Sequence, residues 1–69
     1  RLDEAIADIN HPLKLDSQNS FAYKNRALYF IEINKIEEAI MDLELAKALG
    51  FTEMYGNEVD LLLKKYGSN

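Results

Sequence analysis

Residues 35–50, KIEEAIMDLELAKALG, are the most informative part of the sequence about the fold. They repeat the pattern of residues 1–16, RLDEAIADINHPLKLD, after an interval of 34 residues. Nine of the sixteen aligned pairs are identical or similar, among them Ala5 with Ala39 and Ile6 with Ile40. A fixed interval of about 20 to 50 residues is typical of repeat proteins, in which each repeat is one small unit of secondary structure. The sequence therefore predicts a repeat architecture.

Both copies of this pattern have the apolar spacing of an amphipathic helix. Intervals of three, four and seven residues place side chains on one helix face. The apolar residues are Leu2, Ala5, Ile6, Ile9 and Leu13 in the first copy, and Ile36, Ala39, Ile40, Leu43 and Ala46 in the second. No two-residue alternation is visible, so we expect no strands. The sequence predicts an all-α fold of four helices, near residues 2–15, 20–33, 36–49 and 53–66.

The residues between these segments suit helix ends. Residues 16–20, DSQNS, form a polar joint that offers good N-cap residues to the second helix. Asn34 falls in the turn between the second and third helices, and Gly50 follows the third helix as a C-cap candidate. We expect Thr52 to cap the fourth helix and Gly56 to weaken its first turns.

The 34-residue period with two antiparallel helices per period resembles the tetratricopeptide-repeat (TPR) family. Residues 20–53 would form the complete repeat. Its recurring positions fall on Tyr23, Arg26, Ala27, Phe30, Ala39, Leu43, Ala46 and Phe51. Six of the eight suit the family pattern, whereas Arg26 replaces the usual Leu and Phe51 the usual Pro. The resemblance implies one domain, 1–69, in which 1–19 is the second helix of a truncated repeat and 53–69 a capping helix and tail of a right-handed solenoid.

The composition argues against several functional classes. A net charge of −4 disfavours nucleic-acid binding, and the apolar runs are far shorter than the roughly 20 residues that span a membrane. The chain has no cysteine and one histidine, His11, so convergent metal ligands and a catalytic nucleophile with its base are missing. We therefore expect no enzymatic activity and no cofactor. By default, we expect a piece of a longer cytoplasmic protein.

The resemblance implies a protein-protein interaction scaffold. TPR arrays bind extended peptides along a concave face made by the first helix of each repeat. The corresponding residues here are Phe21, Lys24, Leu28, Ile31 and Glu32. A peptide or partner helix would lie against this stripe, with apolar contacts for affinity and the two charges for orientation. Alternatively, the fourth helix buries Phe21, Leu28 and Ile31.

Asn25 joins these residues as a candidate contact. The sequence Asn25-Arg26 resembles a motif of the TPR domains that clamp the carboxylate of chaperone tails. Such a clamp also needs basic residues in the following repeat, where this chain has Tyr55, Glu58 and Val59, and Glu58 would repel an anionic tail. In the alternative interpretation, Asn25 satisfies backbone groups and Arg26 pairs with an acid such as Asp42 or Glu38.

Self-association is the alternative function. In a truncated repeat, the predicted N-terminal helix would lack the partner that covers its apolar face, so we expect Leu2, Ile6, Ile9 and Leu13 to be candidates for a homo-oligomer contact. Pro12 predicts a kink in this helix, or else a break that lets the segment pair with another molecule. A further apolar group, Tyr29, Phe51, Met54, Tyr55 and Tyr66, suits either an interface or, as we prefer, packing between the third and fourth helices.

Overall fold

The computed structural model describes residues 10, 16 and 18–67, and every regular element among them is a helix. The helices are α2 (Ser20–Glu32), α3 (Ile36–Ala48), α4 (Phe51–Tyr55) and α5 (Glu58–Tyr66). The all-α prediction is therefore confirmed for this part of the chain. Apart from Asn10, the predicted helix 2–15 lies outside the described residues, and so do Pro12, His11 and the self-association candidates Leu2, Ile6, Ile9 and Leu13.

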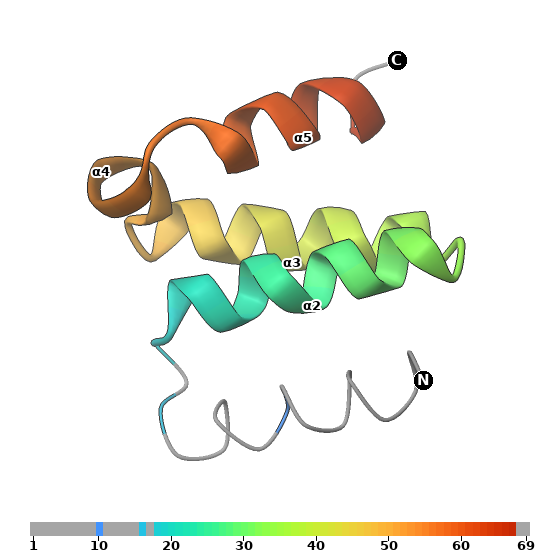
Figure 1. The fold of residues 1–69 in the computed structure, drawn as a ribbon, viewed down its shortest axis with the longest axis horizontal. Coiled ribbons are helices and arrows are strands. Elements are labelled where there is room, and N and C mark those ends of the chain that lie inside the picture. The colour runs from blue at the N-terminus through green and yellow to red at the C-terminus, as the bar shows by residue number, and fades with distance from the viewer. Residues whose placement is uncertain (1–9, 11–15, 17, 68–69) are drawn as a thin grey trace.

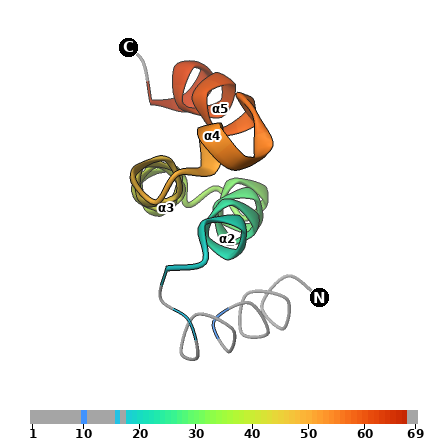
Figure 2. The same cartoon turned by 90° about the vertical axis from the view of Figure 1, so that its left-hand side faces the viewer.

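Helix α3 is the central element, because α2 and α5 both pack against it. Helices α2 and α3 form an antiparallel hairpin, and α5 returns along α3 in the same direction as α2 (Figure 1). The end-on view in Figure 2 places α3 on one side, with α2 and α5 next to each other along the other. The buried core consists of Ala27, Ala39, Leu43, Ala46, Phe51 and Val59. The alanines have no bulk beyond Cβ, which lets the paired helices approach closely.

Helix α2 is bounded by two asparagines with different roles. Asn19 is the N-cap, and its side-chain oxygen accepts a hydrogen bond of 3.0 Å from the backbone N–H of Ala22. At the other end, Asn34 takes the left-handed conformation with φ 62°. The backbone N–H of Lys35 then donates to the Phe30 carbonyl at 2.7 Å, and that of Asn34 to the Ile31 carbonyl at 3.0 Å. These two bonds form a Schellman motif. The predicted polar joint and the turn at Asn34 are both confirmed.

The prediction of one continuous fourth helix over residues 53–66 is wrong. The chain forms α4 directly after Gly50, which has φ 97°, and breaks at Gly56 before α5 begins. Gly56 has φ 106° and ψ −166°, a region open almost only to glycine. Thr52 caps neither helix. It lies within α4, and its hydroxyl donates a 2.8 Å hydrogen bond to Oδ2 of Asp60, which ties α4 to α5.

We expect Gly56→Ala to lower the free energy of unfolding by about 1 to 3 kcal/mol, because alanine is strained at this φ and ψ. A Cβ at this position would meet no atom within 4 Å, so the cost comes from the backbone and not from a steric clash. The neighbouring exposed residue Asn57 has φ −93° and supplies the control, Asn57→Ala. Urea denaturation of both variants measures the difference, and equal stabilities would contradict the role given to Gly56.

Candidate partner-binding groove

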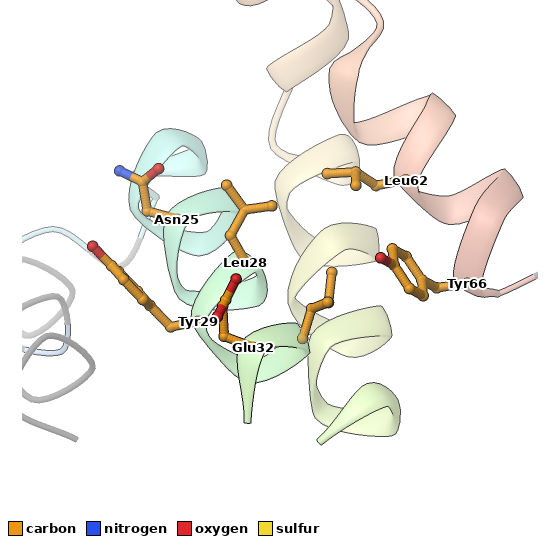
Figure 3. Close-up of a pocket in the computed structure, with 7 residues that line it drawn as sticks. Asn25, Leu28, Tyr29, Glu32, Leu62 and Tyr66 are labelled. Carbon is orange, nitrogen blue, oxygen red and sulfur yellow. The ribbon is translucent and has the colours of Figure 1, made fainter. Parts of the chain in front are cut away.

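A pocket of about 500 Å³ lies between α2 and α5. We call it the α2–α5 groove. Its volume is within the range of about 300 to 1,000 Å³ that is usual for binding sites. The residues that line it are Asn25, Leu28, Tyr29, Ile31 and Glu32 from α2, and Leu62 and Tyr66 from α5 (Figure 3). The groove therefore has one wall from each of the two helices that α3 holds side by side.

Helical spacing explains why these side chains meet. On α2, Asn25, Leu28 and Glu32 are three and four residues apart, so they project from one face. On α5, Leu62 and Tyr66 are four residues apart, and both point toward α2 (Figure 3). Leu28 and Leu62 are separated by 34 residues, the interval of the sequence repeat. The same interval separates Glu32 from Tyr66. Residues separated by the predicted repeat interval thus face each other across the groove.

The groove combines an apolar centre with a polar edge. Leu28, Ile31 and Leu62 are each partly buried, which leaves part of every side chain open to a ligand. Asn25 contributes an amide, Tyr66 a hydroxyl and Glu32 an exposed carboxylate. Such a surface can bind an apolar side chain and orient it through a few hydrogen bonds. Among the described residues, no group of three or more His, Cys, Asp and Glu side chains is arranged to hold a metal ion.

Four of the six predicted partner-binding residues line this groove, namely Asn25, Leu28, Ile31 and Glu32. The suggestion that the fourth helix covers the stripe holds only in part. Leu28 and Ile31 are partly buried, and Phe21 remains 42 % exposed. The groove forms where α5 covers this face of α2 only in part.

Phe21 and Lys24 lie elsewhere, beside the short helix α4. The Phe21 ring centroid is 5.2 Å from that of Tyr55 and 6.2 Å from that of Phe51. The Lys24 ammonium lies 4.5 Å from the centre of the Phe21 ring and 3.6 Å from Oε1 of Glu58. Lys24 is only 7 % exposed. The sequence prediction grouped them with the groove residues because it did not include α4.

Arg26 pairs with Asp42, as one interpretation of the sequence predicted. Its Nε and Nη2 donate to the two carboxylate oxygens at 2.7 Å and 2.8 Å, and its Nη1 donates to Oδ1 of Asn10 at 2.7 Å. The hydrogen bond to Asp42 raises the pKa of Arg26 above its ordinary value, although burial acts in the opposite direction. Asp42 is 3 % exposed, so the pair joins α2 to α3 inside the hairpin. Arg26 is therefore occupied and faces away from a ligand in the groove.

Asp60 fixes the position of α5, and with it the second wall of the groove. Lys47 donates to its Oδ1 at 2.9 Å and Thr52 to its Oδ2 at 2.8 Å. The Lys47 ammonium, followed by the Thr52 hydroxyl, lowers the pKa of Asp60, and the same contact raises the pKa of Lys47. One carboxylate thus connects α3, α4 and α5.

Leu62 was not among the residues predicted to bind a partner, and for Tyr29 and Tyr66 we preferred packing between the third and fourth helices over an interface. Adding the 34-residue interval to Leu28 and Glu32 would have indicated Leu62 and Tyr66. Tyr29 is partly buried, and its ring points away from α5 at the outer edge (Figure 3). Of the other apolar candidates, Phe51 is buried in the core, whereas Met54 and Tyr55 are 59 % and 55 % exposed.

None of the helices α2 to α5 has the length and apolar character needed to cross a membrane. No protein-family model matches the chain. Searches among curated proteins and among solved structures find no match either.

Proposed function

We propose that this chain is a protein-binding module of the TPR type, and that the α2–α5 groove holds a short segment of a partner protein. The observation that carries the proposal is the composition of the groove. Four of the residues that line it are among those that the TPR resemblance implies as partner contacts. The proposed activity is binding, with no chemical step.

The arrangement of the helices supports the TPR interpretation. Helices α2 and α3 form a hairpin with alanines at its buried contacts, and α5 lies where the first helix of a following repeat would lie. Leu28 and Leu62, which are 34 residues apart, face each other from α2 and α5. A face built from the first helices of successive repeats is the surface on which TPR proteins hold peptides. The α2–α5 groove has the same construction.

An apolar side chain of the partner would enter between Leu28 and Leu62. Burial of its surface supplies the affinity, at about 25 cal/mol for each Å² removed from water. The Asn25 amide and the Tyr66 hydroxyl lie within the lining and are suited to hydrogen bonds with the partner's backbone. The affinity then depends on a few apolar anchors, and the polar edge sets the register.

Peptides selected from a random displayed library against the full 69-residue chain test this proposal. We expect the selected peptides to bind with an affinity that Leu28→Gln lowers about tenfold, since the substitution places a polar group at the apolar anchor. Fluorescence anisotropy with labelled peptides gives the dissociation constants. Circular dichroism checks that the variant keeps its helices.

Leu45→Gln is the matched control, because Leu45 is 43 % exposed on α3 and does not line the groove. It makes the same chemical change and should leave the affinity unchanged. Equal losses in both variants would count against the groove, as would a library that yields no binding peptide.

A further inference from the structure

We propose that the α2–α5 groove selects a basic partner segment, in which a Lys or Arg next to the apolar anchor pairs with Glu32. This inference rests on the proposed function and specifies the chemistry of the partner. Three observations carry it: the cations of α2 are already paired, Glu32 is exposed, and Glu32 lies at the carbonyl end of α2.

The cations of α2 are Lys24 and Arg26, and each is bound to an acid of another helix. The Lys24 ammonium is 3.6 Å from Glu58 of α5, and Arg26 makes two hydrogen bonds to Asp42 of α3. An anionic ligand would have to displace one of these acids before it could pair with α2. The positive charge that the sequence offered for orienting a partner is therefore not available to it.

Glu32 is in the opposite situation. Its side chain is exposed, it lines the groove, and within residues 18–67 it takes part in none of the ion pairs, which are Lys24–Glu58, Arg26–Asp42 and Lys47–Asp60. It lies four residues after Leu28 on the same helix face, so a cation bound there would be next to the apolar anchor. Among residues 18–67, the groove thus presents a carboxylate without an ion-pair partner beside an apolar centre.

The C-terminal end of α2 adds to this negative potential. Helices α2 and α5 run in the same direction, so their C-terminal ends lie at the same end of the groove (Figure 1). Glu32 is the last residue of α2, and Tyr66 is the last residue of α5. The carbonyl end of a helix carries roughly half a negative charge, which favours a cation within the last turn. The carbonyl end of α2 has no basic residue in its last turn, so this end and the Glu32 carboxylate attract the same basic side chain. The last turn of α5, in contrast, already carries Lys64 and Lys65.

Two lysines, Lys64 and Lys65, lie in the last turn of α5, on the opposite wall. The Lys65 ammonium is 5.2 Å from the centre of the Tyr66 ring, although Lys65 itself does not line the groove. If the partner were acidic, Lys65 would be the residue that it contacts. The charges of Glu32 and Lys65 therefore make opposite predictions, and their variants distinguish a basic partner from an acidic one.

Three pools of labelled peptides form the test, each with the same apolar anchors and with Lys and Arg, Gln and Ser, or Asp and Glu at the flanking positions. We expect the basic pool to bind the full chain most tightly. Glu32→Gln should weaken its binding about two- to fivefold, the range of an exposed ion pair. Glu44→Gln is the matched control, because Glu44 is exposed on α3, outside the groove, and its loss changes the net charge equally.

The outcomes separate this inference from the proposed function. Loss of the basic preference in Glu32→Gln, with Glu44→Gln and Lys65→Gln unchanged, would support the pairing. If all three pools bind equally, the groove binds segments without charge selection, and the inference fails while the proposed function stands. If the acidic pool binds best and depends on Lys65, the inference is reversed. If no pool binds, both are wrong.

Discussion

Arg26→Leu should lower the free energy of unfolding by about 2 to 4 kcal/mol, one of the two largest single-residue effects that we expect. The substitution introduces the residue type usual at the corresponding position of the TPR family that the sequence resembles, but it leaves the carboxylate of Asp42 buried without its partner. Asp42 has a side chain only 5 % exposed and accepts both hydrogen bonds of the guanidinium. Breaking a buried pair from one side costs several kcal/mol, because the remaining charge is not solvated.

The double variant Arg26→Leu/Asp42→Ala is the decisive comparison. Removal of both charges eliminates the unpaired carboxylate, so the double variant should be more stable than Arg26→Leu alone. Urea denaturation of the wild-type chain, the two single variants and the double variant completes the thermodynamic cycle. If the two substitutions act additively, then the ion pair does not join α2 to α3 in the way described here.

Phe51→Ala should destabilise the chain by about 3 to 5 kcal/mol, the usual cost of removing a buried aromatic ring. Phe51 is 1 % exposed and is one of the largest fully buried side chains. Its ring centroid is 4.9 Å from that of Tyr55, and it packs in the core with Ala27 and Val59. Total stability for a chain of this length is about 3 to 10 kcal/mol, so the loss would be a large fraction of it.

Met54→Ala is the control for this variant. Met54 lies in the same short helix α4 but is 59 % exposed, so its truncation should change stability by less than about 0.5 kcal/mol. Thermal unfolding followed by circular dichroism compares the two variants. A small effect of Phe51→Ala would mean that α4 contributes little to the core, and it would also weaken the explanation for the position of Phe21.

The α2–α3 hairpin could be predicted from the sequence because the signals that specify it are local. The predicted ranges 20–33 and 36–49 differ from α2 and α3 by one residue at their C-terminal ends. Apolar periodicity, the N-cap Asn19 and the turn at Asn34 all act over a few residues. The pairing of Arg26 with an acid of the next helix was also accessible, because the helices had been placed as antiparallel neighbours.

The break between α4 and α5 could not be predicted from local sequence signals. A glycine within a helix costs only about 1 kcal/mol, so Gly56 alone did not exclude a continuous helix. The contact that helps to hold the break in place, between the Thr52 hydroxyl and Asp60, joins residues eight positions apart and depends on the folded chain. The location of Phe21 and Lys24 was missed for the same reason. Phe21 contacts Phe51 and Tyr55 of α4, before the break, and Lys24 contacts Glu58 of α5, after it.

The two ion pairs of α2 differ in how strongly dissolved salt weakens them. Lys24 reaches Glu58 of α5, whose side chain is 53 % exposed, so dissolved salt can screen the contact that links the groove walls. Arg26 meets Asp42 of α3 where water hardly enters, and added ions change that attraction far less. Added salt should therefore weaken the link between α2 and α5 more than the link between α2 and α3.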